Sequence, residues 1–177
     1  MGEMILILGG ARSGKTRLAE RLAEGFGPVS YVATATYDAA DPEMAARIDR
    51  HRADRPEGWE TREVPRDLEA TLGERAVRGG TLLIDCVTLW LTNLMLGLGG
   101  GPELEDRAIL EAVDRAAGMA RGESRAIWVS NEVGSGGVPE NPLARRFADL
   151  QGRANQALAA RADSVHRCVA GLSIRLK

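Results

Sequence analysis

Short apolar runs alternate along the chain with longer segments in which apolar residues recur every three or four positions. The runs are typical of strands buried on both faces, and the longer segments are typical of helices with one buried side. The runs predict strands at 4–8, 29–33, 81–84 and 126–130, with a short additional strand at 61–64. The longer segments predict helices at 16–24, 41–53, 67–78, 88–96, 104–121 and 143–162.

This alternation of strands and helices predicts an α/β fold with a mainly parallel sheet flanked by helices. Two further apolar segments, 165–170 and 172–176, flank Gly171 and predict a closing hairpin that adds an antiparallel edge strand. The length of 177 residues suits a single domain spanning 1–177. The apolar spacing of the last helix predicts its buried side, which comprises Leu143, Phe147, Leu150, Ala154 and Leu158.

Composition places the chain among ordinary globular proteins, with 44% hydrophobic and 27% charged residues. The 23 Lys and Arg residues nearly balance the 25 Asp and Glu residues, so we expect no nucleic acid partner held by a basic surface. The longest apolar stretch, near 89–98, is too short to span a bilayer, and no secretory leader is visible. We therefore expect a cytoplasmic protein without a transmembrane segment.

The segment GGARSGKT, after the first predicted strand, matches the phosphate-binding pattern G-x-x-x-x-G-K-[ST] at every fixed position. Backbone N–H groups of such a loop surround phosphate oxygens, and the N-terminus of the following helix favours negative charge. Lys15 would reach the β and γ phosphates, and Thr16 would offer its hydroxyl to Mg²⁺. The predicted nucleotide-binding residues here are Gly9, Gly10, Ala11, Arg12, Ser13, Gly14, Lys15 and Thr16.

Asp85 follows the predicted strand at 81–84, where P-loop folds place a second carboxylate linked to the metal. It would hold Mg²⁺ directly or through water. The alternative is an ordinary Asp at a strand end that caps the next helix. The neighbouring Cys86 is interpreted as a small core residue.

His51 is one of two histidines and lies among arginines on a strongly charged predicted helix. One interpretation is a solvated surface residue. The other is a nucleophile, because a neutral imidazole nitrogen can attack phosphorus and form a phosphoramidate while neighbouring arginines neutralise phosphate charge. The second histidine, His166, falls within a strand pattern and is interpreted as structural.

The segment 131–141 is rich in Gly and Pro and follows the strand at 126–130. Ligands of parallel α/β sheets bind at the carboxyl ends of the strands. Asn131, Glu132 and Glu140 are therefore candidates for contact with substrate, and the two carboxylates could also bind metal. The alternative is a loop without a chemical role.

Several blocks of the chain together resemble one family. They are GGARSGKT, RIDRH, LLIDCVTLWLTNL, the segment 129–163 and the closing GLSIRLK. They resemble the bifunctional adenosylcobinamide kinase / adenosylcobinamide-phosphate guanylyltransferase of cobalamin biosynthesis, over nearly the whole chain. The P-loop is widely shared, whereas NEVG-x-G-x-VPE-N followed by R-x-F-x-D-x-x-GR-x-NQ is distinctive.

The resemblance implies a RecA-like P-loop NTPase fold and two activities. Adenosylcobinamide is phosphorylated on its aminopropanol hydroxyl from ATP or GTP, and GMP is then transferred from GTP to adenosylcobinamide phosphate through a guanylylated histidine. That role falls to His51, and relatives can carry a second histidine where this chain has Arg50. The resemblance also implies a homotrimer. Beyond the P-loop, it implies nucleotide contacts at Thr34, Ala35, Thr36, Arg52, Glu63 and Asp85.

Two alternatives to this bifunctional enzyme remain at this point. One is a P-loop kinase for a small molecule without guanylyltransferase activity, in which His51 is incidental. The other is a RecA-like ATPase that acts as a switch.

Overall fold

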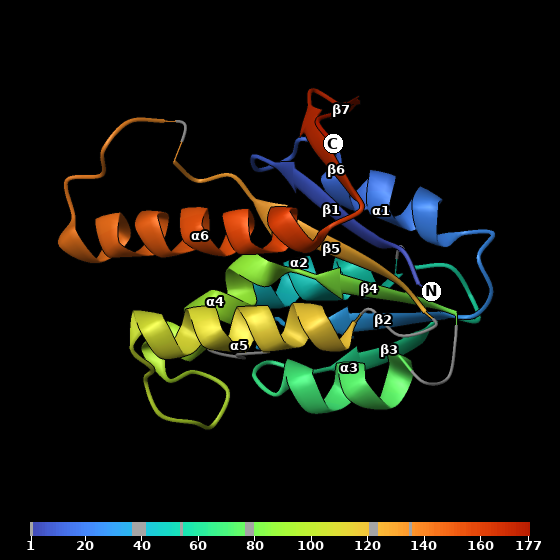
Figure 1. Ribbon diagram of the computed structural model, residues 1–177, viewed down its shortest axis with the longest axis horizontal. Coiled ribbons are helices and arrows are strands. Elements are labelled where there is room, and N and C mark those ends of the chain that lie inside the picture. Colours follow the sequence, from blue (N-terminus) through green and yellow to red (C-terminus); the bar gives the residue numbers. More distant parts are fainter. Residues whose placement is uncertain (1, 37–41, 54, 77–79, 121–123, 135) are drawn as a thin grey trace.

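A computed structural model describes residues 2–36, 42–53, 55–76, 80–120, 124–134 and 136–177. Seven strands form one sheet in the order β3-β2-β4-β5-β1-β6-β7 (Figure 1). The strands are β1 Met4–Gly9, β2 Val29–Ala33, β3 Glu60–Glu63, β4 Thr81–Asp85, β5 Arg125–Asn131, β6 Ser164–Val169 and β7 Leu172–Arg175. The helices are α1 Lys15–Ala23, α2 Pro42–Ala53, α3 Leu68–Ala76, α4 Val87–Leu96, α5 Asp106–Met119 and α6 Pro142–Arg161.

The sheet is parallel except at one edge, where β7 pairs antiparallel with β6. This confirms the predicted α/β fold and the closing hairpin. Positions 41, 77–78 and 121, which the sequence placed in helices, lie outside the described residues. Among the residues that are described, no helix combines the length and the apolar character needed to cross a membrane.

The sheet carries a hydrophobic core on each face. Alternate side chains of β1, β2, β4 and β5 pack with α1 on one face, and the other alternate set packs with α3, α4, α5 and α6. Trp90 and Trp128 are fully buried within the larger core, and the Trp90 indole N–H donates to the Arg66 carbonyl at 2.7 Å. The helices therefore cover both faces of the sheet, and a ligand would bind beyond the carboxyl ends of the strands.

One predicted core residue is exposed. Leu143 keeps 47% of its surface accessible, whereas Leu150, Ala154 and Leu158 are buried as predicted and Phe147 packs against the core. The reason is length, because the first turn of α6 extends past the neighbouring strands (Figure 1). Asn141 starts this helix by accepting hydrogen bonds from the N–H groups of Leu143 and Ala144.

The parallel register brings the carboxyl ends of the six parallel strands, β1 to β6, to one edge of the sheet. Gly9 pairs with Asn131 in β5, and Ala33 pairs with Asp85 in β4 and with Glu63 in β3. Segments that are far apart in sequence therefore end side by side. This edge contains every sequence position that was predicted to handle phosphate, apart from those on α2.

The turn of the C-terminal hairpin contacts the loop after β1. The Gly171 N–H donates to the Ser13 carbonyl at 2.9 Å. A Cβ on Gly14 would come within 3.0 Å of the Gly171 Cα, and both glycines have a positive φ, of 92° and 80°. A side chain at Gly14 would push the turn away from the loop, so close approach as well as conformation favours glycine there. At Gly171 only the positive φ favours glycine, because a Cβ on it would meet no atom within 4 Å.

Candidate active site

The loop between β1 and α1 has the backbone of a phosphate-binding loop. Arg12 and Gly14 adopt left-handed conformations with φ of 56° and 92°, and Gly14 is the N-cap of α1. No side chain of the described residues caps this helix, so its first N–H groups are available to an anion at the positive end of the helix dipole. Lys15 is 9% exposed, and its ammonium lies across the loop and donates to the Gly10 carbonyl at 3.0 Å.

Asp85, at the end of β4, receives a hydrogen bond from a buried tyrosine. The Tyr31 hydroxyl donates to Asp85 Oδ2 at 2.6 Å, and the Tyr31 side chain is 3% exposed. Burial, followed by the charge of Asp85, raises the pKa of the Tyr31 phenol far above its ordinary value, although nearby Arg55 opposes the shift. Tyr31 therefore remains a hydrogen-bond donor at physiological pH.

The residues on either side of Asp85 are fixed by backbone contacts. The Thr34 hydroxyl donates to the Cys86 carbonyl at 2.7 Å and accepts from the Cys86 N–H at 2.9 Å. The buried Asn93 side chain donates to the carbonyls of Thr34 and Pro65 at 2.8 and 3.0 Å. Burial, and second the Asp85 charge, raise the pKa of the Cys86 thiol to about 11. The ends of β2 and β4 are thus held together beside the carboxylate.

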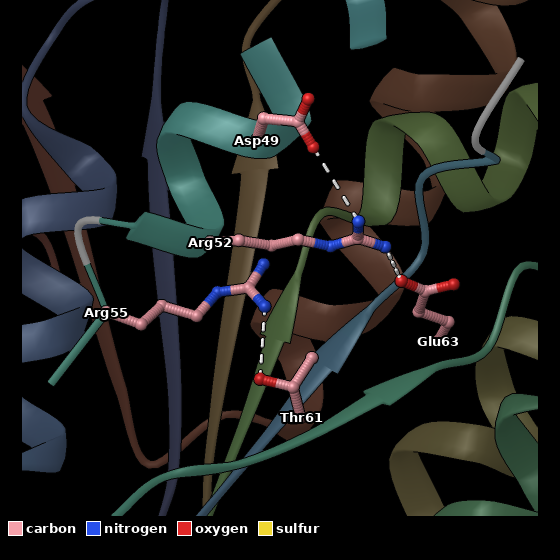
Figure 2. A network of polar contacts seen from close by, with 5 residues as sticks. All are labelled: Asp49, Arg52, Arg55, Thr61 and Glu63. Carbon is pink, nitrogen blue, oxygen red and sulfur yellow. Dashed lines mark hydrogen bonds and ion pairs between the residues drawn. The ribbon is translucent and has the colours of Figure 1, made fainter. Parts of the chain in front are cut away.

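Two arginines tie the region of α2 to the sheet, as Figure 2 shows. Arg52 forms an ion pair with Glu63 at the end of β3 and lies 3.7 Å from Asp49. Arg55, just after α2, donates to the Thr61 hydroxyl at 3.0 Å, and its guanidinium stacks 3.8 Å from the centre of the Tyr31 ring. These contacts place α2 over the carboxyl ends of β2 and β3.

A single pocket joins α2 to the phosphate loop. Fourteen residues line it: Lys15, Thr16, Tyr31, Ala33, Ala35, Ile48, His51, Arg52, Arg55, Glu63, Asp85, Cys86, Leu89 and Asn131. His51 therefore shares a cavity with the P-loop lysine and threonine, although it lies 36 positions after Lys15 in the sequence (51 minus 15). An imidazole in this place can approach a phosphate group of a nucleotide that is bound in the same cavity.

Of the three site residues predicted in the loop after β5, one lies in the pocket and two lie outside it. Asn131 lines the pocket, and its side-chain oxygen is buried without a hydrogen-bond partner among the described residues. Glu132 forms an ion pair with Arg167 of β6 at 2.9 Å, and Glu140 is exposed. Neither carboxylate lines the pocket. The structure thus brings Asn131 to the other predicted site residues and does not bring Glu132 or Glu140 there.

Two predicted nucleotide contacts in the segment after β2 also have different environments. Ala35 lines the pocket, whereas Thr34 is fully buried and uses its hydroxyl on Cys86. Sequence reasoning missed Tyr31, Arg55, Ile48 and Leu89 as pocket residues. No motif marks them, because Tyr31 and Leu89 fit the pattern of core residues and Arg55 is one of many arginines. Tyr31 reaches the pocket because β2 lies beside β4, and the other three reach it through the placement of α2, of the residues just after it and of α4.

The donor set of the pocket fits a magnesium ion bound with nucleotide. Thr16 supplies a hydroxyl and Asp85 a carboxylate on the same cavity wall as Lys15. Within the described residues, no group of three or more His, Cys, Asp or Glu side chains forms a metal cage. Mg²⁺ is usually held by one or two carboxylates together with substrate phosphates and water, so a small protein donor set is what this ion needs.

The fold and the pocket define a P-loop nucleotide-binding protein. Solved structures of the ATPase EscN from the enteropathogenic Escherichia coli type III secretion system share the fold, with a TM-score of 0.58 at 14% identity over 96% of this chain and 43% of that chain. A Pyrococcus horikoshii structure gives a TM-score of 0.55 at 12% identity, over 99% of this chain and 86% of that chain. At these identities the likeness concerns the fold alone.

Family membership comes from the sequence comparisons. The profile of the family described as cobinamide kinase / cobinamide phosphate guanyltransferase matches residues 5–176, and the chain belongs to this family. A relative from Pseudomonas aeruginosa, bifunctional adenosylcobalamin biosynthesis protein CobP, is 51% identical over 97% of this chain and 96% of its own. The Salmonella typhimurium protein CobU is 43% identical over 98% of this chain and 99% of its own. The chain is thus a bifunctional transferase of adenosylcobalamin biosynthesis.

Proposed function

We propose that the chain carries out two consecutive transfers in this one pocket. It first phosphorylates the aminopropanol hydroxyl of adenosylcobinamide from ATP or GTP. It then moves GMP from GTP to adenosylcobinamide phosphate by way of a guanylylated His51. The observation that carries the proposal is that His51 lines the same cavity as Lys15, Thr16 and Asp85.

The kinase step uses the phosphate loop. Backbone N–H groups at the start of α1 and the Lys15 ammonium bind the β and γ phosphates. Thr16 and Asp85 would hold Mg²⁺, directly or through water, and the ion would neutralise charge on the phosphates. The buried side-chain oxygen of Asn131 belongs to a pocket residue and has no hydrogen-bond partner among the described residues, so we assign it to accept from the hydroxyl of the incoming substrate. Glu132 and Glu140 stay weaker candidates for corrinoid contact.

The guanylyl transfer begins at His51. An imidazole nitrogen attacks the α phosphorus of GTP, an N–P bond forms, the bond to the bridging oxygen of the β phosphate breaks, and pyrophosphate leaves. A phosphate oxygen of adenosylcobinamide phosphate then attacks the same phosphorus and breaks the N–P bond. Adenosylcobinamide-GDP leaves and the imidazole is restored. Arg52 and Arg55 line the cavity and stabilise the negative charge of both transition states.

The two steps need different phosphate positions relative to the loop. Transfer of the γ phosphoryl group requires the terminal phosphate at the acceptor, whereas guanylylation requires the α phosphorus at His51. A change in the position of α2, or a second register of the nucleotide, would meet this need. We favour movement of α2 over a second nucleotide register, because the polar contacts of Arg52 with Glu63 and of Arg55 with Thr61 can be broken at little cost.

Further assignments concern the metal, the nucleotides, the location and the partners. Mg²⁺ is the metal, ATP and GTP are the nucleotides, and the enzyme works in the cytoplasm without a nucleic acid partner. The near balance of charge supports the last point. A homotrimer is expected from the family resemblance.

Labelling with GTP tests the histidine step. The protein is incubated with α-labelled GTP and Mg²⁺ without any corrinoid, and the protein-bound label is then exposed to acid and to base. A phosphoramidate is lost in acid and kept in base. His51→Asn should take up no label. The matched control is His166→Asn, which replaces the second histidine of the chain, located on β6, and it should take up as much label as the wild type.

Two further arms separate the alternatives. If the wild type phosphorylates cobinamide yet takes up no label, the protein is a kinase only and the role of His51 is wrong. Hydrolysis of ATP is also measured with DNA, with RNA and with cobinamide. Stimulation by a nucleic acid without any effect of cobinamide would favour a RecA-like ATPase switch and would overturn the proposal.

A further inference from the structure

Tyr31 and Asp85 meet diagonally across neighbouring parallel strands. In the register of β2 and β4, Tyr31 pairs with Leu83 and Ala33 pairs with Asp85. Tyr31 and Asp85 are therefore two positions apart in register and lie on the same face of the sheet. The long phenol side chain spans this offset, and its hydroxyl donates to Asp85 Oδ2 at 2.6 Å.

The hydrogen bond restricts the carboxylate. A bond from a neutral donor to a charged oxygen is short and directional, and it fixes the plane of the group that accepts it. Oδ2 is engaged in this way, which leaves Oδ1 as the oxygen available to a metal ion or to one of its waters. Metal-ligating carboxylates are ordinarily oriented by such hydrogen bonds.

Tyr31 is itself held from two sides. Its ring belongs to the core on the α1 face of the sheet, next to Ala33 and Leu83. The Arg55 guanidinium stacks on the ring at 3.8 Å and donates to Thr61 on β3. The ring cannot turn away from Asp85 without losing both contacts, so its hydroxyl is a fixed donor.

We propose that Tyr31 is a positioning residue, which orients Asp85 for the complex of nucleotide and Mg²⁺. The inference rests on the proposed function, because that function makes Asp85 the carboxylate linked to the metal. In this role the Tyr31 hydroxyl acts through Asp85, to which it donates, although the tyrosine also lines the pocket.

A purely structural role for the tyrosine makes a different prediction. If the hydroxyl only satisfied a buried carboxylate, its removal would lower stability and leave the contribution of metal to nucleotide binding unchanged. If it orients the carboxylate, removal would weaken binding in the presence of Mg²⁺ and have no effect in its absence. Nucleotide affinity with and without the metal therefore separates the two roles.

The experiment measures binding of a non-hydrolysable GTP analogue by calorimetry, in Mg²⁺ and in EDTA. Four proteins are compared: the wild type, Tyr31→Phe, Asp85→Asn and Thr81→Val. Tyr31→Phe removes one oxygen and keeps the ring under Arg55. Thr81→Val is the matched control, because Thr81 starts β4 at the opposite end from Asp85 and donates a comparably buried hydrogen bond to Phe26 at 3.2 Å.

For the wild type we expect tighter binding in Mg²⁺ than in EDTA. Tyr31→Phe should lower this ratio about tenfold, the lower end of what loss of a metal-orienting contact costs, and should keep the wild-type affinity in EDTA. That EDTA affinity also reports that the pocket is folded. Asp85→Asn should lower the ratio of affinity in Mg²⁺ to affinity in EDTA at least as much, and Thr81→Val should keep the wild-type ratio.

Two outcomes overturn the inference, and they can be told apart. If Asp85→Asn loses the ratio and Tyr31→Phe keeps it, Tyr31 does not position the carboxylate and the proposed function stands. If Asp85→Asn also keeps the wild-type ratio, then the assignment of Asp85 to the metal is wrong, and the inference about Tyr31 falls with it.

Discussion

Thr34, just after β2, exchanges two hydrogen bonds with the backbone of Cys86, just before α4. The hydroxyl donates to the Cys86 carbonyl at 2.7 Å and accepts from its N–H at 2.9 Å. Asn93 binds the Thr34 carbonyl at 2.8 Å from within α4. The fully buried threonine therefore joins two strand ends at the wall of the pocket.

Replacing Thr34 with Val should destabilise the protein by about 1–3 kcal/mol, because the Cys86 N–H would lose its partner and the Cys86 carbonyl would keep the Trp90 N–H alone. Urea unfolding measures the change. Thr34→Ser keeps the hydroxyl and should retain most of the stability. A larger loss in Thr34→Ser than in Thr34→Val would mean that the methyl group, and not the pair of hydrogen bonds, holds this position.

Replacing Lys15 with Met should abolish detectable transfer in both steps, because both use the triphosphate bound at the loop. Loss of the ammonium removes its contact with the Gly10 carbonyl and takes away the positive charge that would bind the β and γ phosphates. In wild type, GTP at a hundred times its dissociation constant should stabilise the fold by about 2.7 kcal/mol. Thermal unfolding with and without GTP reports this gain, which Lys15→Met should lose. A variant that keeps guanylylation and loses only kinase activity would contradict a shared loop.

Arg52→Gln should loosen α2 and leave global stability nearly unchanged. The ion pair with Glu63 is exposed, and such pairs contribute below about 1 kcal/mol. Hydrogen exchange followed by mass spectrometry should show faster exchange in 42–53, with α6 as the internal reference. Glu63→Gln should have the same effect, and the double variant should add little to either single change. Additive effects would show that the two side chains hold α2 independently.

The Cys86 thiol should react slowly with iodoacetamide near neutral pH. Its pKa is raised to about 11, first by burial and then by Asp85, so about one thiol in a thousand is ionised at pH 8. The rate should rise roughly tenfold with each pH unit up to about pH 10, because only the thiolate reacts. Cys168→Ser isolates the signal, and bound GTP should protect Cys86, which lines the pocket. A rate that levels off near pH 8.5 would contradict the raised pKa.

Local features of this protein could be predicted from its sequence. The apolar run of β1 and the glycines after it lie within one short segment, so the strand, the phosphate loop and α1 follow from neighbouring residues alone. The strand that ends in Asp85 is equally local. Leu143 fits the helical period and is nevertheless exposed, because the period does not say how far α6 extends beyond the sheet.

Contacts between distant segments could not be predicted in this way. Tyr31 and Asp85 are 54 positions apart and meet only because β2 lies beside β4, an order that the chain does not reveal from its periodicity. Glu132 looked like a ligand of substrate, and its partner in the fold is Arg167, 35 positions away. The place of His51 beside the phosphate loop came from resemblance to a family, since a charged helix carries no signal of what it faces.

The contact between Gly171 and the Ser13–Gly14 segment has a practical meaning for anyone who modifies this protein. The tip of the final hairpin touches the phosphate loop, so inserting even a single residue there should displace the loop backbone. The chain then runs back along β6, and the Leu176 N–H bonds to Val165 at the far end of that strand. An affinity tag or a linker should therefore not be inserted into the turn of this hairpin.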